Sequence, residues 1–453
     1  MNKKVCMLLH QFYPNDIRVS KEAKSIIISG FDIHMLCLGR KNEASSEVVN
    51  GIHVHRVAIA QTFFWRGIWD IVLAFSFSQP IFKRKLRQLQ KKECFVAFHV
   101  HDLPLAKTAI QVAEEFSDVK TILDMHENYP EALKVWFQWK KNPVIRLKNK
   151  LFFGFDRWLK YERWACEKAD HVVVVVDEMK ERLQSIHNIK LEKLTVVTNT
   201  ESADFLNQEH IKNIYERKEG DFILAYTGSV GPHRGVDVAV KAMKHLDLPQ
   251  IRLEITGTLS DDSRKWLTDL AKENGVENRV LINGYQPFHK FFSYMAYADV
   301  NLIPHNRNGH TDNTIPHKLF QGMMVAKPVL VSDAPPLKRI VEATEGGLIF
   351  EAGNDEDFAE KIRQAGPWGQ NFLEPVFDDQ FTLIQQRIVG EKHLKMVVEK
   401  QGQVFDAIAF NIDVKQWPNS KATQVHLCFR LDINEYRGKQ SLQLMIENLA
   451  LVS

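Results

Sequence analysis

The segment that most constrains the fold runs from Asp299 to Phe350. Apolar runs of strand length alternate in it with helix-like stretches, and the order strand, polar loop, helix, strand, helix, strand is typical of a parallel sheet. Residues 306–313 are polar and rich in turn formers, which predicts the loop. Thr314 as N-cap and Pro316 in the first turn predict the start of the helix. Its free backbone N–H groups would lie beyond the carboxyl end of a strand, which makes an anion site.

The length of 453 residues predicts two or three domains, and 45% hydrophobic with 25% charged residues indicates globular domains with sizeable cores. The net charge of +3 is nearly balanced and carries no information about nucleic acid. The five cysteines lack the spacing of a metal site or a disulfide framework, which favours buried free thiols and a cytoplasmic location. We expect no signal peptide and no transmembrane segment, because no apolar run reaches the roughly 18 residues that a span requires.

The first half of the chain alternates between strands and helices. The predicted elements of its opening βαβ unit are a strand at 5–9, a loop at 10–17, a helix at 19–29 ending at Gly30, and a strand at 32–38. Further strands are predicted at 94–100, 121–125, 169–176 and 194–198. The valine-rich run before residue 176 has no polar face, which predicts a sheet covered by helices on both faces.

Changes in composition predict the domain boundaries. The polar and charged residues 201–220 indicate a hinge between two α/β domains, at 1–200 and 221–364. Beyond residue 364 the pattern changes to period-two alternation with turns and without helical crossovers, which predicts a small all-β domain over 365–453.

Polar side chains follow two predicted strands of the first domain. His99 and His101 close one strand, and the run DMHEN at 124–128 closes another. The carboxyl ends of parallel strands share one edge of a sheet, so these groups are candidates for ligand binding. The alternative for a histidine at a strand end is a purely structural role, in which its ring nitrogens are hydrogen-bonded within the protein, and this is about as common as ligand binding. Adjacent side chains without an evident third ligand do not indicate a metal site.

A glycine-rich turn follows the first predicted strand of the second domain. It reads TGSVGPHRG at 227–235 and leads into a helix. Glycines allow the backbone to approach a diphosphate closely, although they are a weak signal alone. Arg234 can hold phosphate oxygens in a forked geometry. Gly257 closes the next strand of the same domain.

Residues 1–364 resemble glycosyltransferase family 4. The run KLFQ at 318–321 stands where this family commonly has Lys-Leu-Phe-Glu, and AKPV at 326–329 matches its Gly/Ala-x-Pro-Val strand. Gln321 departs from the usual glutamate, and Ser229 replaces the first of two cations that meet the donor phosphates in the family. The resemblance implies the GT-B architecture, in which two Rossmann-like domains face a cleft.

The resemblance also implies roles for single residues. Catalytic roles fall to His101, Arg234 and Lys318. Donor binding falls to Gly228, Ser229, Gly235, Gly257, Pro316 and Gln321. Acceptor binding falls to Arg18, Asp124, His126 and Glu127, although Arg18 has the alternative of an ion pair with Glu22. The nucleotide-sugar is a co-substrate, and no cofactor or metal is expected, because cations and backbone N–H groups stabilise the departing diphosphate.

The implied activity is that of a retaining hexosyltransferase in polysaccharide, lipopolysaccharide or glycolipid synthesis. It would move a sugar from a nucleotide-sugar to a hydroxyl of a saccharide or lipid-linked acceptor. Residues 62–92 and 135–164 combine aromatic and basic side chains at helical spacing. Peripheral contact with the inner face of the cytoplasmic membrane is one interpretation, and ordinary helix packing is the other.

The tail resembles the carboxyl-terminal OB-like domain of the RecJ family of single-stranded-DNA exonucleases. The matching runs are GPWGQ at 366–370, DAIAFN at 406–411 and RLDINEYRG at 430–438. The carboxylate-rich metal site of that nuclease has no counterpart upstream, and the tail carries no basic excess to attract DNA. The tail takes the place of the helices that usually close the donor domain. A natural fusion, an artificial joining of two reading frames and an OB-like module kept for another purpose are the three explanations, and a joining is favoured because the seam falls inside a helix that both families possess. Two alternative functions are single-stranded-DNA binding in repair and inactive nucleotide-sugar binding.

Overall fold

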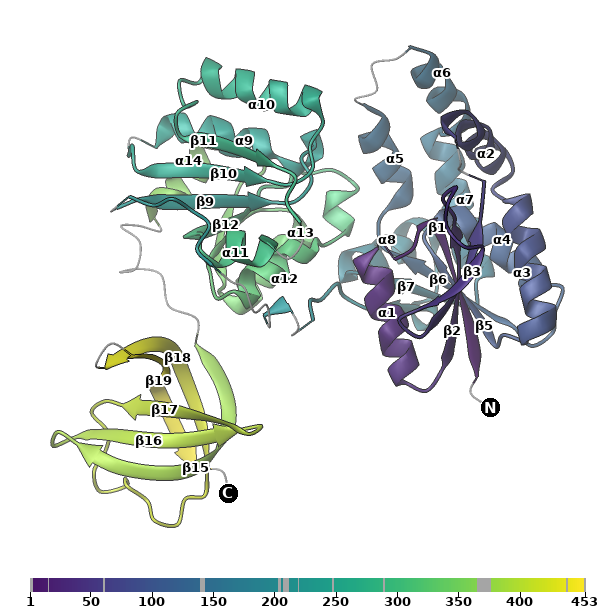
Figure 1. Ribbon diagram of the computed structural model, residues 1–453. Coiled ribbons are helices and arrows are strands. Elements are labelled where there is room, and N and C mark those ends of the chain that lie inside the picture. Colours follow the sequence, from purple (N-terminus) through teal and green to yellow (C-terminus); the bar gives the residue numbers. More distant parts are fainter. Residues whose placement is uncertain are drawn as a thin grey trace. The chain divides into compact units, whose positions relative to one another are not determined.

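The computed structural model describes residues 3–14, 16–59, 62–138, 143–202, 205–206, 212–218, 220–246, 248–287, 290–364, 376–436 and 439–451. The chain divides into two compact units, Met1–Ala359 and Glu360–Ser453. The first unit holds two α/β domains, each with its own sheet, and the second holds a closed β-barrel (Figure 1).

The sheet of the first domain has the strand order β3-β4-β2-β1-β5-β6-β7-β8 and is parallel except for β3. Its strands are β1 (Lys4–Phe12), β2 (Asp32–Leu38), β3 (Ser46–Val49), β4 (Ile52–Val57), β5 (Ala97–His101), β6 (Lys120–Met125), β7 (His171–Val174) and β8 (Leu194–Val196). Its helices are α1 (Ile17–Ile28), α2 (Phe63–Ser76), α3 (Pro80–Glu93), α4 (Ala106–Ala113), α5 (Tyr129–Gln138), α6 (Pro143–Phe152), α7 (Phe155–Lys168) and α8 (Asp177–His187).

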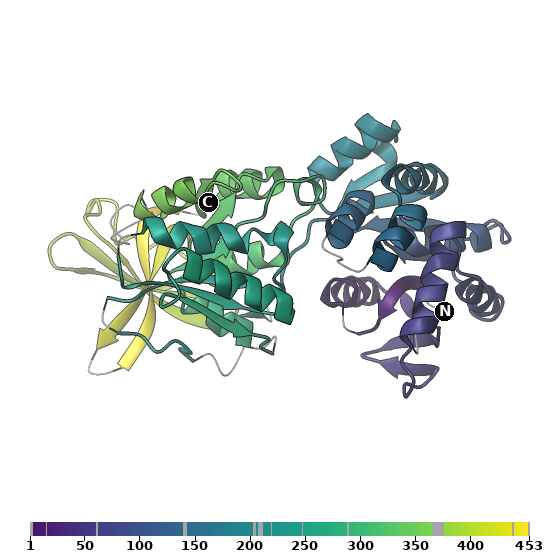
Figure 2. The ribbon, with the colours of Figure 1, turned by 90° about the horizontal axis from the view of Figure 1, so that it is seen from above.

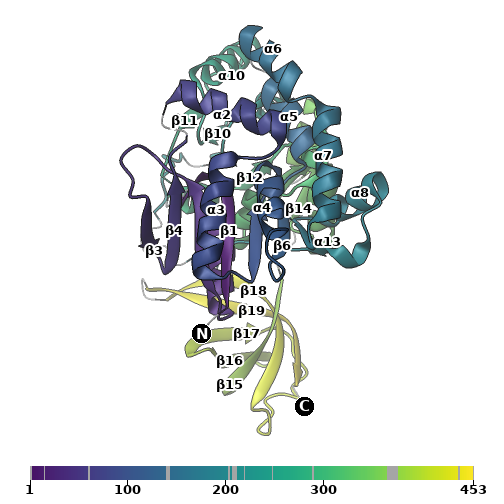
Figure 3. The ribbon, with the colours of Figure 1, turned by 90° about the vertical axis from the view of Figure 1, so that its right-hand side faces the viewer.

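Alternation along β1 explains why this sheet has helices on both faces. Met7 and Leu9 pack in the core that contains Val19 of α1. Leu8 packs in the core that contains Phe82 of α3 and residues of α4. Figure 3 shows α3 and α4 in front of the sheet. Successive side chains of a strand point to opposite faces, so an uninterrupted apolar strand is buried twice.

The second domain has a six-stranded parallel sheet of order β11-β10-β9-β12-β13-β14. Its strands are β9 (Phe222–Thr227), β10 (Ile251–Thr256), β11 (Val280–Gly284), β12 (Val300–Ile303), β13 (Val329–Ser332) and β14 (Gly347–Phe350). Its helices are α9 (Val236–Ala242), α10 (Asp261–Glu273), α11 (Phe291–Ala296), α12 (His317–Met324), α13 (Pro335–Thr344) and α14 (Asp355–Gln364), and they lie on both faces (Figure 2).

Both sheets reverse their strand order at one place. The reversal lies between β1 and β5 in the first domain and between β9 and β12 in the second. In an open parallel sheet, a crevice forms outside the carboxyl ends of the strands at such a switch point, and ligands bind there. The topology therefore predicts one candidate site in each domain.

The tail forms a barrel of order β15-β16-β17-β19-β18, closed between β18 and β15. Its strands are β15 (Phe377–Val389), β16 (His393–Lys400), β17 (Gln403–Ala409), β18 (Gln424–Tyr436) and β19 (Lys439–Leu451). Alternate apolar residues such as Leu394, Met396 and Val398 fill its core. The all-β prediction is confirmed, while the GPWGQ run lies outside the described residues.

Several local predictions are wrong. Pro316 itself is the N-cap of α12, without a side-chain cap bond, and Thr314 instead donates from Oγ1 to the carbonyl O of His126, 3.2 Å away. Strand β1 continues past residue 9 because Phe12 still pairs with Leu38 of β2, so the loop begins later.

The prediction that the free thiols are buried holds for three of the five cysteines. Cys6, Cys37 and Cys166 are buried, but Cys94 is exposed and Cys428 is partly exposed. None of the described helices combines the length and apolar character that crossing a bilayer requires.

Candidate active site

A cavity of about 590 Å³ lies where the two switch points face each other. The first domain and the connection after it contribute Gln11, Arg18, His126, Glu127, Trp136, Asn199 and Glu201. The second domain contributes Thr227, Gly228, Ser229, Arg234, Phe291, His305, His310, residues 314–318 and Gln321. We call this cavity the cleft. It unites segments that are widely separated in the chain.

Most of the predicted site residues line the cleft. They are Arg18, His126, Glu127, Gly228, Ser229, Arg234, Pro316, Lys318 and Gln321. Four predicted residues are not among those that line it: His101, Asp124, Gly235 and Gly257. His101 and Asp124 are buried beneath its floor, with exposed fractions of 1% and 3%.

Two cations lie on the second-domain wall. The Nη1 atom of Arg234 is 3.3 Å from Nε2 of His305. The Nζ atom of Lys318 lies 3.8 Å from the ring centroid of Tyr226. Burial, and then the charge of Arg234, hold the pKa of Lys318 well below its usual value. An anion placed between these two cations would relieve their repulsion, so this wall suits a diphosphate.

The start of α12 adds backbone donors to the same wall. Pro316 is the N-cap, and residues 316–318 line the cleft. The first N–H groups of a helix have no partner within the helix and carry a partial positive charge. The predicted anion site is thus built beside the two cations.

Gly235 and Gly257 act through close backbone approach. Gly235 has φ +64°, and a Cβ there would overlap the carbonyl O of Pro304. A Cβ at Gly257 would overlap the carbonyl O of Gly228. Only glycine permits these approaches. Both residues therefore shape the turn that carries Gly228 and Arg234.

Three histidines near the second-domain wall were not among the predicted site residues: His233, His305 and His310. Burial, followed by the charge of Arg234, lowers the pKa of His233 to about 4 and of His310 to about 3. The same causes, with Lys318, hold the pKa of His305 well below its usual value. These imidazoles are neutral at pH 7. His305 and His310 lie in a polar loop after a strand and follow no motif, whereas His233 lies in the glycine-rich turn 227–235, where attention fell on the glycines and Arg234.

Arg18 and Glu127 occupy the first-domain wall. Arg18 pairs with Asp16, with 3.0 Å between Nη2 and Oδ2, so the alternative of an ion pair with Glu22 is wrong. The side chain of Asp16 also caps α1 and so lies next to Arg18. Burial raises the pKa of Glu127 to about 7, against the opposing charges of Arg18 and Arg234.

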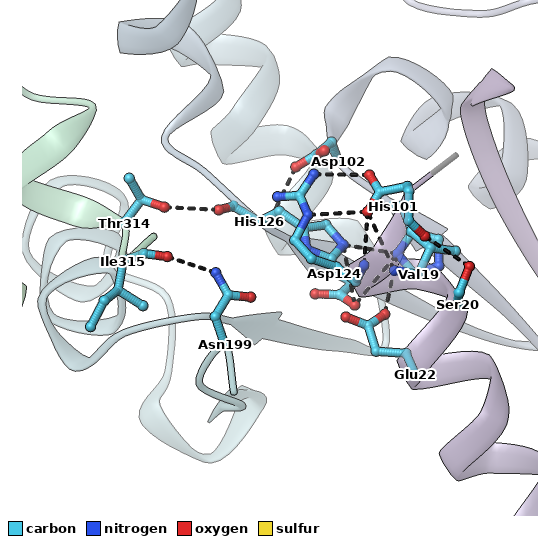
Figure 4. A network of polar contacts seen from close by, with 12 residues as sticks. Val19, Ser20, Glu22, His101, Asp102, Asp124, His126, Asn199, Thr314 and Ile315 are labelled. Atoms are coloured by element: carbon cyan, nitrogen blue, oxygen red, sulfur yellow. Dashed lines mark hydrogen bonds and ion pairs between the residues drawn. The ribbon is translucent and has the colours of Figure 1, made fainter. Parts of the chain in front are cut away.

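A buried polar network lies beneath this wall. His101 Nδ1 and His126 Nε2 are 2.9 Å apart, and His99 Nε2 lies 2.9 Å from Asp124 Oδ2. His101 and Asp124 are register partners on the neighbouring strands β5 and β6. Figure 4 shows His101, Asp124 and His126 grouped together. The side chains share one sheet edge, but burial keeps His101 and Asp124 out of the cleft.

A second cavity, of about 360 Å³, lies within the first domain. Its aromatic lining residues are Phe12, Trp69, Tyr129, Trp136, Phe137, Phe153 and Trp158. It shares Gln11, Glu127 and Trp136 with the cleft. We call it the inner pocket. Part of the aromatic stretch 135–164 therefore packs around a cavity, while residues 139–142 lie outside the described part of the chain.

Hydrogen bonds join the two walls of the cleft. Asn128 donates from Nδ2 to the carbonyl O of Gly309 at 2.8 Å. Asn199 donates from Nδ2 to the carbonyl O of Ile315 at 2.7 Å. These bonds reach the loop after β12 and the start of α12, so they hold the second-domain wall of the cleft against the first domain.

Two doubly wound domains with a shared cleft form the GT-B architecture. The fold is similar to that of a solved sucrose-phosphate synthase from Thermosynechococcus elongatus, with a TM-score of 0.60, 17% identity, and coverage of 80% of this chain and 90% of that one. It is also similar to WaaG, a glycosyltransferase involved in lipopolysaccharide biosynthesis, with a TM-score of 0.56, 16% identity, and coverage of 80% and 90%.

Family models describe the chain as a composite. Residues 18–200 match the Glycosyl transferase 4-like domain, and residues 207–365 match Glycosyl transferases group 1. Residues 351–448 match the RecJ OB domain. The chain therefore carries the two domains of a glycosyltransferase followed by the OB domain of RecJ, and both resemblances found in the sequence are confirmed.

Curated relatives divide in the same way. The RecJ exonuclease of Dickeya dadantii is 56% identical over 93 residues, which are 20% of this chain and 16% of that protein. The uncharacterized glycosyltransferase MJ1178 of Methanocaldococcus jannaschii is 24% identical over 217 residues, which are 48% of this chain and 52% of that protein. The chain thus spans about half the length of this glycosyltransferase and less than a fifth of the exonuclease.

Proposed function

We propose that this protein transfers a hexosyl group from a nucleotide-sugar to a hydroxyl group of an acceptor, with retention of configuration. The observation that carries the proposal is the cleft itself. It sets Arg234, Lys318 and the start of α12 on one wall and Arg18 with Glu127 on the other. A donor held by its diphosphate on the first of these walls would present its sugar to the second.

The donor wall would act mainly by stabilising the leaving group. Charge develops on the diphosphate as the bond to the sugar breaks, and preorganised donors aimed at that charge lower the barrier. Arg234, Lys318 and the first N–H groups of α12 supply such donors. We propose that no metal is needed for this step, because Arg234 and Lys318 would stabilise the charge of the diphosphate.

The acceptor would enter from the inner pocket. Aromatic side chains bury apolar faces of sugars or of a lipid tail, and a few polar groups orient the reacting hydroxyl. Glu127 lies at the junction of the inner pocket and the cleft, so it suits that orienting role. A saccharide or lipid-linked acceptor fits this lining. Since His101 and Asp124 lie beneath the floor, we assign acceptor contacts to Arg18 and Glu127.

Exposed apolar residues support peripheral membrane contact. They lie on the contacting helices α2 and α6: Trp65, Phe75, Leu147 and Leu151, with exposed fractions of 53%, 73%, 60% and 64%. Such residues beside exposed basic groups suit an anionic interface. Sedimentation with anionic vesicles, but not with neutral ones, is expected. Equal recovery in the supernatant from both would contradict membrane contact.

Binding of the donor is tested by thermal shift with nucleoside diphosphates and their sugar conjugates on the full chain. Nucleoside diphosphates that carry one particular nucleobase are expected to stabilise the protein by about 2.7 kcal/mol when their concentration is a hundred times Kd. Arg234→Ala and Lys318→Met should abolish this effect, whereas Lys265→Met, on an exposed position of α10, should not. No stabilisation by any nucleotide would contradict the proposal.

Transfer is tested separately, because an inactive binder would also show the thermal shift. Incubation with the stabilising nucleotide-sugar and candidate acceptors should release the nucleoside diphosphate and give a product whose anomeric configuration matches the donor by NMR. Binding without turnover across saccharide and lipid-linked acceptors would favour the inactive binder. An inverted product would contradict retention.

Single-stranded-DNA binding is the second candidate function, and the RecJ OB domain is the observation that favours it. Phe410 of the barrel is 50% exposed and could stack on a base. Fluorescence anisotropy of a labelled oligonucleotide should then show affinity that falls with salt and with Phe410→Ala, but not with Val414→Ala, another exposed position. Absence of binding at low salt would exclude this function.

A further inference from the structure

Two imidazoles and two carboxylates converge at the edge of the first-domain sheet, where His126 reaches the cleft and the proposed transfer uses none of the four. They are Glu22 of α1, His101 at the end of β5, and Asp124 and His126 at the end of β6. One possible ligand atom of each residue lies within 4.8 Å of those of the other three. Figure 4 shows the four side chains pointing toward a common centre.

The distances fit a tetrahedral metal site. The Nδ1 atom of His101 lies 2.9 Å from His126 Nε2, 3.5 Å from Glu22 Oε2 and 3.6 Å from Asp124 Oδ2. His126 Nε2 lies 3.7 Å from Asp124 Oδ2. In a tetrahedral zinc site with ligands about 2.0–2.1 Å from the ion, neighbouring ligand atoms are about 3.3 Å apart. For these four pairs, shifts of a few tenths of an ångström would give tetrahedral spacing, and the remaining two pairs lie within 4.8 Å.

The charges of the cluster also call for a cation. Among the described residues, no Lys or Arg forms an ion pair with Glu22 or Asp124, and both carboxylates meet only imidazoles at ion-pair distance. Arg18, the nearby guanidinium, bonds to Asp16 instead. The Oε2 atom of Glu22 is buried and has no hydrogen-bond partner in the described part of the protein. Asp124 is buried and the Glu22 side chain is 26% exposed. Burial, followed by the charge of Asp124, raises the pKa of Glu22 to about 10, and a divalent cation between the two carboxyl groups would favour the ionised form of both.

Outer residues orient the ligands as they do in metal sites. His99 holds Asp124 from the side with 2.9 Å between Nε2 and Oδ2. The backbone N–H of His126 donates to Asp102 Oδ1 at 3.0 Å. Hydrogen bonds of this kind fix the direction of a ligand before the ion arrives.

We propose that the first domain binds one divalent transition-metal ion between Glu22, His101, Asp124 and His126. Two nitrogen and two oxygen ligands in a tetrahedral arrangement favour zinc among the common ions. The ion would join α1 to the ends of β5 and β6, directly under the floor of the cleft. This inference stands apart from the proposed transfer reaction, because metal binding requires neither donor nor acceptor.

The ion would also determine which nitrogen of His101 carries a proton. Coordination through Nδ1 leaves the proton on Nε2. His101 lines the inner pocket, and its Nε2 has no hydrogen-bond partner within the described residues. The metal would thus hold His101 as a hydrogen-bond donor, which makes His101 a positioning residue for whatever the pocket binds.

The test measures metal in the full chain, purified without metal-affinity steps. Mass spectrometry should find about one zinc per chain in the wild type, and less than about a tenth as much in Glu22→Gln and Asp124→Asn. Apo protein prepared with a chelator should take up Co²⁺ with the intense visible absorption of a tetrahedral site. Adding Zn²⁺ should raise the melting temperature of the apo wild type but not that of the apo Glu22→Gln variant.

A second group in the same domain gives the matched control. Asp32, His34 and His53 also lie within ligand distance of one another, but His53 is exposed, and its side chain is 44% accessible. His53→Gln should keep its metal. Metal that persists in Glu22→Gln and is lost in His53→Gln would overturn the proposal. So would a wild-type chain that holds no metal and whose apo form gains no stability from Zn²⁺ or Co²⁺. Circular dichroism of the variants separates lost ligands from lost folding.

Discussion

Gln321 donates a hydrogen bond from Nε2 to Oε2 of Glu201, with 2.5 Å between the two atoms, although 120 positions separate them in the chain. Glu201 also forms an ion pair with Lys21 of α1. Both Gln321 and Glu201 line the cleft. A carboxylate is therefore present beside position 321, where the resembled family commonly has its own glutamate, but a different segment supplies it.

Glu201→Gln should weaken binding of the nucleoside diphosphate by about tenfold or more. Hydrogen bonds to a charged group contribute about 1.5–3 kcal/mol, and the substitution removes the charge from this wall of the cleft. Gln321→Glu should also weaken binding, because two carboxylates would then face each other. The double variant, with the pair reversed, should recover much of the affinity. Calorimetry measures all three, and equal affinity in Glu201→Gln and the wild type would contradict the assignment.

Gly235→Ala should destabilise the second domain by more than about 2 kcal/mol, because a left-handed φ and an overlap with the Pro304 carbonyl act together. Urea unfolding followed by circular dichroism gives the value. Gly67→Ala is the control, since Gly67 lies in α2, and a Cβ there would meet nothing within 4 Å. That change should be neutral or stabilising by up to about 1 kcal/mol. Similar losses in both variants would contradict the role of Gly235.

The neutral histidines of the second domain should make it sensitive to acid. The folded pKa of His233 is about 4 and that of His310 about 3, below the unfolded value of about 6.5. The unfolded chain therefore binds more protons, and the free energy of unfolding falls as pH falls from about 6.5 toward 4. His233→Asn should reduce the loss measured between pH 7.5 and pH 5. An unchanged pH dependence in this variant would show that His233 is not involved.

Trp136→Ala should impair use of the acceptor and spare the donor. Trp136 lines both the inner pocket and the cleft and packs edge-on against Tyr129, with 5.7 Å between ring centroids. The expected result is a fall of at least about tenfold in kcat/KM for the acceptor, with the nucleotide Kd unchanged, since Trp136 is 38% exposed and an acceptor that covered its ring would gain about 1.5–3 kcal/mol. Tyr285→Ala, an exposed aromatic position of the second domain, should change neither value. A parallel loss of nucleotide affinity would contradict an acceptor role.

The architecture was largely predictable from the sequence. The apolar strands around Val172 and Leu224 and the alternation from Leu394 to Val398 are periodic signals that need no tertiary information. The glycine-rich turn before Gly235 and the segment that leads to Lys318 were also evident. Their meeting at one cleft follows from parallel topology, because every carboxyl strand end lies at the same edge.

Contacts between distant segments were not predictable, because they depend on side-chain directions after packing. Thr314 was predicted to cap its own helix, yet it donates to His126 of the other domain. Arg18 forms its ion pair with Asp16 and not with Glu22, and the carboxylate of Glu22 lies next to His101. Local sequence describes neighbours along the chain, while these partners are neighbours only in space.

The amino-acid sequence alone determined the two doubly wound domains, the barrel and the segments that carry Arg234 and Lys318, because periodicity and turn chemistry act over short stretches. The tertiary structure decided that His101 is buried, that Glu201 accepts a hydrogen bond from Gln321, and that two carboxylates and two imidazoles lie within 4.8 Å of one another. Burial and charge pairing are properties of the packed chain, and residues far apart in sequence acquire them only when their strands and helices meet.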